Sequence, residues 1–214
     1  MDKGETSMNN FRLNEKTYST VLFGNFEYSD GGWIRQNDIH VKYPLEWMIL
    51  DVDDKNKKML LLAKNIVELN GFANCPIIGR GYSTSWEKSY LRYWLNSDFI
   101  NTAFTVQERT LICTTHISPQ KCLQKKTLDR IFLLSEKEYR QFFTEHSGAT
   151  YWSYVSKESL NTIKISAESR PWWLRTVSEN DDSKVKIIEP DGKLSCSDSN
   201  ANEIGIRPAM WVKF

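Results

Sequence analysis

Residues 170–177 read R-P-W-W-L-R-T-V, and this stretch decides the fold that the sequence predicts. Adjacent tryptophans with a leucine and a closing valine are typical of a strand, so we expect a strand over 171–177. Alternation along a strand sends Trp172 and Leu174 to one face and Trp173 and Arg175 to the other. One tryptophan is therefore expected in the core. The other either packs there too or forms an exposed platform on which a sugar ring or a partner side chain stacks.

Four more aromatic blocks accompany this stretch. Together the five blocks hold six of the eight tryptophans, and three arginines lie among their rings: Arg92, Arg175 and Arg207. A guanidinium stacks on aromatic rings or forks to a carboxylate, for which Glu46 and Glu87 are candidates. The blocks therefore predict a packed scaffold and not a catalytic centre. They are residues 43–47, 85–96, 132–136, 170–175 and 205–211.

The whole chain has the composition of one globular domain. Its 214 residues include 40% hydrophobic and 26% charged side chains, and no linker-like segment divides them. We expect a polar N-terminal segment over 1–17 and a single domain over 18–214. A formal charge of +1 lacks the uniform positive field that holds proteins on nucleic acid, so no nucleic-acid partner is expected.

Neither a secretory leader nor a membrane span is visible in the sequence. The first residues are polar, and no window approaches the roughly 18 apolar residues that a spanning helix needs. We therefore expect a soluble cytoplasmic protein with no membrane insertion, or an extracellular one if a leader was removed.

Hydrophobic periodicity predicts an α+β domain with an antiparallel sheet. Three segments have the S/T-x-x-E form of a capping box, in which a hydroxyl and a carboxylate each satisfy a free backbone N–H. They begin at Thr84, Thr105 and Ser135 and predict helices there, with a break over 96–102 between the first two. Residues 148–169 are expected to form a long irregular excursion. Strands are expected at 18–23, 46–52, 59–63, 111–117, 130–134, 171–177, 184–189, 193–196 and 206–214.

Taken in order, the five blocks resemble a bacterial family of domains of unknown function, family 6273. The marks of that family are an early P-x-E-W, a helix ending in W-L-N, an F-L-L-S-x-x-E, a W-W-L-R and a closing G-x-R-P-A. The likeness covers 18–214. Here the marks are residues 44–47, 94–96, 132–138, 172–175 and 205–209.

The family is similar to the C-type-lectin-like fold in its formylglycine-generating-enzyme-like branch. The resemblance implies a twisted antiparallel sheet with two or three packed helices, a first strand paired with the last, and a binding face of long C-terminal loops. Formylglycine-generating enzymes bind copper through two cysteines close together near the C-terminus. Only Cys196 lies in that region here, which speaks against their oxidase chemistry.

The expected binding surface is formed by 147–169, 176–182 and 196–203. The last two segments contain acidic, amide-rich runs whose oxygen atoms suit calcium, although solvated turns are the simpler explanation. The candidate ligand-binding residues are Trp152, Arg170, Trp172, Arg175, Asp181, Asp182, Asn200 and Glu203.

The four cysteines are widely spaced, so free thiols are the expectation. Cys113, His116 and Cys122 form a C-x-x-H-x5-C run that supplies three zinc ligands, with Cys75 or His146 as the fourth. Structural zinc sites more often show two tight ligand pairs, so no metal is expected.

The sequence favours a non-catalytic binding module for a protein or glycan ligand, without a cofactor. It lacks the nucleophile elbow, zinc-protease, P-loop and dinucleotide motifs, and its three histidines are scattered. A stiff aromatic framework with polar loops is an arrangement on which recognition sites are grafted. Two alternatives stay open. One is an enzyme of unfamiliar type that uses the thiol of Cys196 or Cys113 with a nearby histidine; the other is a regulatory or toxin-associated partner domain.

Overall fold

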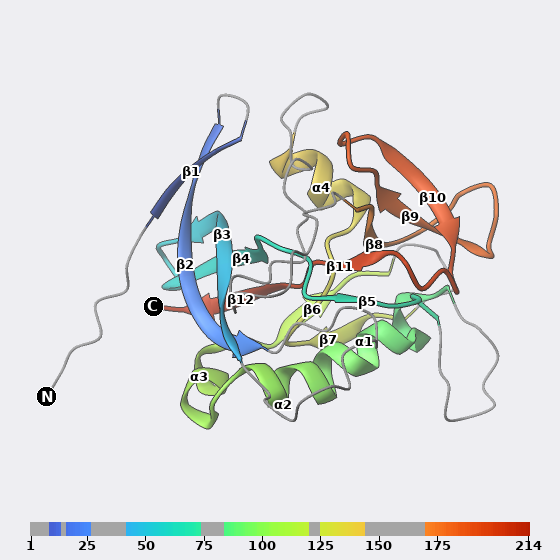
Figure 1. The fold of residues 1–214 in the computed structure, drawn as a ribbon. Coiled ribbons are helices and arrows are strands. Elements are labelled where there is room, and N and C mark those ends of the chain that lie inside the picture. The colour runs from blue at the N-terminus through green and yellow to red at the C-terminus, as the bar shows by residue number, and fades with distance from the viewer. Residues whose placement is uncertain (1–8, 14–15, 27–41, 74–83, 120–124, 144–169) are drawn as a thin grey trace, which may run out of the picture.

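The computed structural model describes residues 9–13, 16–26, 42–73, 84–119, 125–143 and 170–214, and the side chains among them from Tyr18 onward. Within this part of the chain lie two five-stranded sheets and one two-stranded sheet. Helices α1 to α3 run along one side of the molecule and α4 lies on the opposite side (Figure 1). The domain is therefore α+β with mainly antiparallel sheets, as the periodicity predicts.

The first sheet is antiparallel throughout and has the strand order β1-β2-β3-β4-β12. β3 and β4 form the predicted hairpin. β1 lies inside the segment predicted to be a polar tail, so the sequence pattern misses it. The strands are β1 (Asn9–Leu13), β2 (Lys16–Phe26), β3 (Tyr43–Asp53), β4 (Lys58–Ala63) and β12 (Ala209–Lys213).

The predicted pairing of the strand at 18–23 with the last strand is wrong. β12 pairs with β4, with Met210 opposite Leu61, and β3 and β4 separate it from β2. The opening strand instead pairs with β3, where Val21 lies opposite Trp47. Both ends of the described chain thus share one sheet without touching each other.

The second sheet has the order β10-β9-β8-β11-β5, and β11 runs parallel to β8. Its hairpin, β9 and β10, contains the turn predicted at 190–193. The single final strand predicted over 206–214 is two strands, because Arg207 and Pro208 carry the chain from this sheet to the first one. The strands are β5 (Glu68–Leu69), β8 (Trp172–Val177), β9 (Lys184–Ile188), β10 (Leu194–Asp198) and β11 (Gly205–Ile206).

The third sheet pairs β6 (Thr115–Ile117) with β7 (Thr127–Asp129). The strand predicted at 130–134 does not form as such, although Phe132 makes a single bridge to Ala209 of β12. The same segment also bonds to the second sheet, because Leu134 O accepts from Arg175 N of β8 at 2.9 Å. It therefore links the two larger sheets.

The helical stretch is continuous from Tyr90 to Ala103, and the interruption before the helix predicted at Thr105 lies at Phe104 and Thr105. After α1 the chain continues through a π-helical turn into α2, so the predicted break over 96–102 is wrong. The helices are η1 (Trp86–Lys88), α1 (Tyr90–Trp94), η2 (Leu95–Phe99), α2 (Ile100–Ala103), α3 (Val106–Leu111) and α4 (Glu136–Phe142).

Two of the three predicted capping boxes are confirmed. Thr105 caps α3 and Ser135 caps α4, each with both reciprocal hydrogen bonds. The third is wrong, because Thr84 Oγ1 donates to Asp182 O at 2.7 Å instead of capping a helix. Ser89 caps α1 in its place, accepting from Arg92 N at 3.2 Å.

Gly205 lies where β11 meets the core, and a side chain has no room there. A Cβ on this residue would stand 2.3 Å from Ile66 Cδ1 and 2.6 Å from Ile66 Cγ1, and Ile66 is itself fully buried. We expect Gly205→Ala to lower the free energy of unfolding by about 1–3 kcal/mol through overpacking. Urea unfolding measures the loss.

The matched background for this change is Ile66→Ala, which removes the atoms that a new Cβ would meet. In that background Gly205→Ala should cost much less, so the two changes should be strongly non-additive. Equal costs in both backgrounds would show that the steric account is mistaken.

Candidate functional site: an acidic loop face

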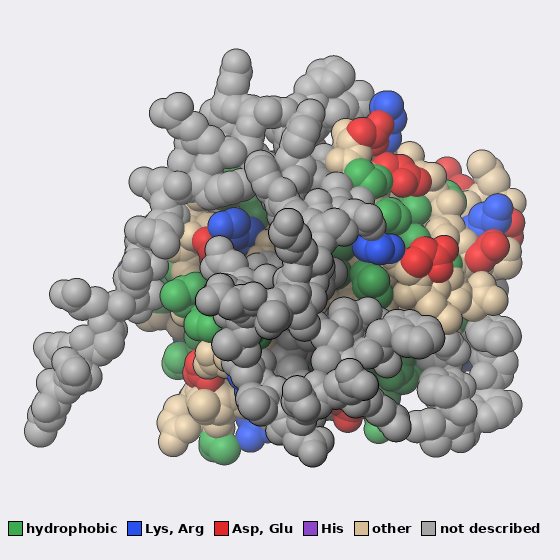
Figure 2. All heavy atoms as spheres, in the orientation of Figure 1, with side chains coloured by type: hydrophobic (Ala, Val, Ile, Leu, Met, Phe, Trp, Pro, Cys, Tyr) green, Lys and Arg blue, Asp and Glu red, His purple; other side chains and the backbone are tan. Residues whose placement is uncertain are grey.

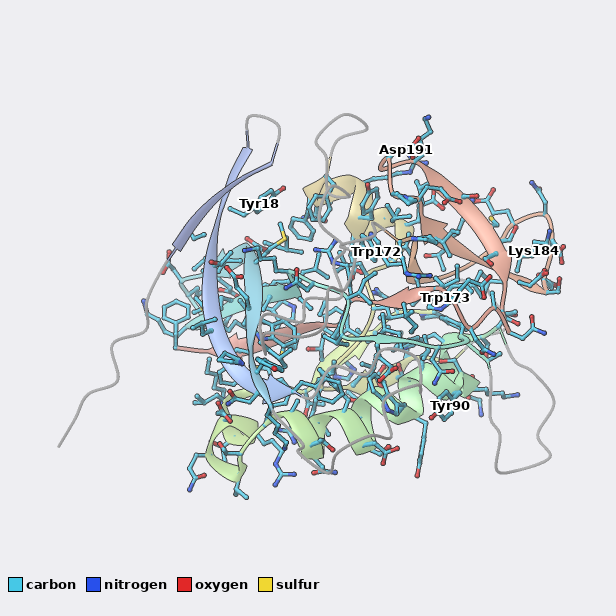
Figure 3. The ribbon with its side chains drawn as sticks, viewed as in Figure 1. Tyr18, Tyr90, Trp172, Trp173, Lys184 and Asp191 are labelled. Atoms are coloured by element: carbon cyan, nitrogen blue, oxygen red, sulfur yellow. The ribbon has the colours of Figure 1, made fainter. Side chains whose placement is uncertain are left out.

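The side chains of the W-W-L-R block lie in the core. Trp172 and Trp173 have no exposed surface, and Figure 3 places both in the middle of the molecule. Trp172 packs edge-on against Tyr139 of α4 with ring centroids 5.9 Å apart. Trp173 packs against Phe72 at 5.8 Å, and its Nε1 donates to Asn70 O at 2.8 Å. The core role foreseen for at least one tryptophan therefore applies to both.

Arg175 forms a buried ion pair with Glu138 of α4. Its two terminal nitrogens lie 2.5 Å and 2.8 Å from the two carboxylate oxygens, and its Nη1 also donates to Leu133 O. Burial by itself raises the pKa of Glu138, but the bonds from Arg175 and Ser135 outweigh it and hold that pKa below its usual value. The pair ties α4 to β8.

Arg207 is the most deeply buried of the motif arginines. Its guanidinium lies 4.7 Å from the ring centroid of Trp172, and its Nε donates to Ala63 O at 3.0 Å. Burial lowers the pKa of Arg207 to about 10. Arg207 thus connects β11, β4 and β8 through stacking and a backbone carbonyl.

Arg92 belongs to a third polar cluster, around Asp129. The fully buried carboxylate of Asp129 accepts from Arg92 Nε at 2.7 Å, Trp86 Nε1 at 2.8 Å and Thr127 Oγ1 at 2.6 Å. The structural pairing predicted for Arg92 and Arg175 is confirmed, but the partners are Asp129 and Glu138 and not the suggested Glu46 or Glu87.

Asn96 of the W-L-N block joins the helical stretch to the segment after β7. Its amide Nδ2 donates to Ile131 O at 2.8 Å, while its Oδ1 accepts from Arg130 N at 2.8 Å and from Ile131 N at 3.2 Å. The blocks that mark the sequence are therefore built from residues that hold elements together.

This placement removes two candidates from the surface. Trp172 and Arg175, both predicted as ligand-binding residues, have 0% and 3% of their surface exposed and serve the core in this structure. In the described part of the chain, Trp172 Nε1 and Arg175 Nε are buried donors without a hydrogen-bond partner. The sequence could not distinguish a tryptophan platform from a core strand covered on both faces.

Two loops that the sequence places about twenty residues apart lie side by side beyond the ends of β8, β9 and β10. We call residues 179–182 and 198–203 the acidic loop face. Lys184 lies opposite Asp198 in the β9–β10 ladder, and Ser199 N donates to Ser183 O at 3.3 Å just beyond it. Figure 2 shows acidic side chains gathered on the side of the molecule where β9 and β10 lie.

The acidic loop face is fixed to the rest of the domain by backbone bonds. Ala73 N donates to Ser199 O at 2.9 Å, and Thr84 Oγ1 donates to Asp182 O at 2.7 Å. Within the second loop, Ala201 N donates to Asp198 O at 3.0 Å. The loops are therefore positioned by contacts to segments before α1 as well as by the hairpin.

Asp181 shapes the first loop from within. Its Oδ1 accepts from Ser183 N at 2.9 Å and from Ser183 Oγ at 2.6 Å. These two hydrogen bonds lower the pKa of Asp181, and the one from the Ser183 hydroxyl has the larger effect. Asp182, Asn200 and Glu203 are exposed on the same pair of loops. Four of the eight candidate ligand-binding residues are thus brought together.

The remaining candidates lie elsewhere. Arg170 is half-buried and precedes β8, whereas Asp181 follows it, so the length of a six-residue strand separates them, about 20 Å. Trp152 and the excursion over 147–169 lie outside the described residues. So do Cys122, Cys75 and His146 of the zinc hypothesis.

Among the residues that the structure describes, no three His, Cys, Asp or Glu side chains come close enough together to hold a metal ion. Cys113 and Cys196 are free and half-buried, and His116 is exposed. In the same part of the chain, no helix is long and apolar enough to span a bilayer.

These observations define a class of protein: an α+β domain whose motif tryptophans and arginines make internal contacts and whose β8–β9–β10 end carries an exposed acidic loop face. The chain belongs to the DUF6273 family, described as a domain of unknown function, whose model matches residues 56–214. No curated protein and no solved structure matches the chain.

The family match begins just before β4, so β1, β2 and β3 lie outside it. Inside the matched region the first strand is β4 and the last is β12, and these two are hydrogen-bonded neighbours. These two strands are the first and last of the matched region, and the predicted pairing of the strand at 18–23 with the last strand remains wrong.

The sequence pattern does not predict the partners of three structural residues. It predicts a capping role for Glu138 and no partner for Asp129 or Asn96. Each has contacts more than 30 residues away in the chain. The available signal was their position inside or near an aromatic block, because polar residues that are buried with aromatic side chains need internal partners.

Proposed function

We propose that this chain is a non-catalytic binding domain that recognises a protein or glycan ligand through the acidic loop face. The observation that carries the proposal is the hydrogen bond from Ser199 N, in the second loop, to O of Ser183, the residue that directly follows the first loop, on a hairpin anchored to the core. Exposed polar loops on a rigid scaffold are where recognition sites are commonly found.

The same proposal takes the fold to be C-type-lectin-like. Support comes from the β4–β12 pairing inside the family region and from loops near the C-terminus that gather beyond one hairpin. The motif side chains add support for a binding role over catalysis, because Arg92, Arg175 and Trp173 are engaged in internal contacts. None of the three is left to act on a substrate.

The test removes charge from the acidic loop face without changing its shape. Ligands are first selected with the unaltered domain from a glycan array and a random-peptide phage library. The double variant Asp182→Asn, Glu203→Gln is expected to bind the selected ligand about tenfold more weakly, because both carboxylates are exposed on the face. Titration calorimetry measures the dissociation constants.

The matched control is Asp54→Asn with Asp98→Asn, which removes two exposed charges from the β3–β4 turn and from η2. It should leave affinity unchanged. Equal affinity of the loop variant and the control would refute the proposal. Alkylation of Cys113 or Cys196 far faster than a free thiol reacts would favour the thiol enzyme instead.

A further inference from the structure

β10 is the outer strand of the second sheet, and its backbone bonds fix which of its groups face outward. Beyond its two ends, Glu189 N donates to Lys193 O at 2.9 Å and Ser199 N donates to Ser183 O at 3.3 Å. Alternate residues of an antiparallel strand bond to the same neighbour, so Ser195 and Ser197 bond to β9. The N–H and C=O groups of Leu194 and Cys196 therefore point away from the sheet.

No described residue bonds to these outward groups, so within the part of the chain that the structure describes β10 is an edge strand. Natural sheets block such edges with proline, bulges, lysine or a covering segment. β10 contains no proline, and its five pairs with β9 run without a shift in register. The lysine before it, Lys193, is held at 2.6 Å by Asp191 of the turn. The edge is a template for one more strand.

The charges around this edge indicate what kind of strand it accepts. Residues 178–203 carry seven acidic and three basic side chains, a net charge of −4, whereas the whole chain carries +1. Acidic groups stand at both ends of the hairpin, with Asp191 in its turn and Asp198 beside Lys184 at the other end (Figure 3). A positively charged segment would therefore be attracted by acidic side chains at either end of β10.

A second copy of the chain is a poor occupant for the same reason. Antiparallel pairing of two β10 strands would set the turn of one hairpin, with Glu189 and Asp191, against the acidic loop face of the other. Like charges brought together at both ends of the new pair oppose its formation. The charge pattern selects against self-association and for a foreign, positively charged partner.

We propose that β10 accepts an extended basic segment of a partner protein as an added strand. Backbone bonds from Leu194 and Cys196 supply sequence-independent affinity, and lysine or arginine side chains of the segment meet the acidic loop face. This inference rests on the proposed function and narrows its ligand to a basic peptide.

The probe is a synthetic peptide of alternating lysine and threonine, about eight residues long. A peptide of alternating glutamate and threonine is its control. Amide hydrogen exchange, followed by NMR on the isotope-labelled domain, should slow about tenfold or more at Leu194 and Cys196 when the lysine peptide is added. Exchange at Ser195 and Ser197 should change little, because those amides already bond to β9. The glutamate peptide should slow none of them.

A pair of variants tests the backbone contact. Cys196→Pro removes an outward N–H while leaving the bonds of Ser195 and Ser197 to β9, and Cys196→Val keeps that N–H. We expect the proline variant to bind the lysine peptide about tenfold more weakly than the valine variant. Thermal unfolding of both variants establishes that each is folded, and the exchange measurement needs no variant.

Unchanged exchange at Leu194 and Cys196 in the presence of bound lysine peptide would overturn the inference. Equal binding by the proline and valine variants would do the same. If the lysine peptide does not bind while selected ligands still depend on Asp182 and Glu203, the edge inference fails and the proposed function stands. If the peptide adds to β10 while the loop variant keeps every selected ligand, the proposed function alone fails.

Discussion

Glu138→Ala is expected to lower the free energy of unfolding by about 3–4 kcal/mol, because it leaves the guanidinium of Arg175 buried without its counter-charge. The Arg175 side chain is 4% exposed, whereas that of Glu138 is 31% exposed, so the loss should lie toward the lower end of the range for buried pairs. The change also deletes the carboxylate that accepts from Ser135 N at 2.7 Å. Urea unfolding at neutral pH, followed by tryptophan fluorescence, measures the loss.

The control is Glu136→Ala on the same helix. Its carboxylate pairs with Arg140, which is half exposed, and with Lys186 at 3.6 Å, so its removal should cost about 1 kcal/mol or less. Equal losses for the two variants would mean that burial of Arg175 adds nothing to the cost.

The contribution of Glu138 should also depend on pH in a definite direction. Since its pKa in the folded protein is lowered, its contribution is fully present above the unfolded value of about 4.3 and is lost as the pH falls through the folded value. The stability difference between the unaltered domain and Glu138→Gln should therefore shrink below about pH 4. A difference that stays constant down to pH 3 would contradict this assignment.

Asp129→Ala should be comparably damaging, at about 3–5 kcal/mol, because a single fully buried carboxylate satisfies three donors. Its loss leaves Trp86 Nε1 and Thr127 Oγ1 without an acceptor and Arg92 without its charge partner. Thermal unfolding gives the shift in midpoint, and urea unfolding gives the free energy.

Asp129→Asn separates charge from shape at this position. The amide keeps one acceptor oxygen, so its loss should be smaller than that of alanine but still above that of Thr127→Val, which deletes one donor alone. If alanine and valine substitutions at 129 and 127 cost the same, the cluster does not act through the carboxylate.

Local patterns in the sequence were sufficient where the partners are near in the chain. The capping boxes at Thr105 and Ser135 need only residues three positions apart, and both form. The same pattern at Thr84 fails because its hydroxyl is claimed by Asp182, 98 residues away. Ser89 then supplies a better-placed cap for the helix that follows.

Pairing of strands that are neighbours in the chain was predictable, whereas pairing of strands far apart in the chain was not. Hairpins such as β3–β4 and β9–β10 follow from alternating apolar residues around turn residues. The neighbours of β12 depend on how Arg207 and Pro208 redirect the chain, which no periodicity encodes. β5 has two residues and leaves no pattern to detect.

The candidate site was predictable to a similar degree. Acidic, amide-rich composition located both loops, and their contact follows from the hairpin register once β9 and β10 are paired. The roles of Trp172 and Arg175 were not, because alternation places them on opposite faces of the strand, whereas both contact α4 and the β8–β9 register shifts between Trp173 and Val177. Solvent exposure there is a property of tertiary packing.

Strands β1, β2 and β3 affect the stability of the family region when that region is expressed alone. A fragment that begins at residue 56 keeps β4 and loses β3. β3 pairs with β4 along the whole length of β4 and contributes Trp47 and Met48 to the core. The fragment would expose both the apolar side chains that β3 covers and the unpaired backbone edge of β4. We therefore expect residues 56–214 to be less stable alone than in the whole chain.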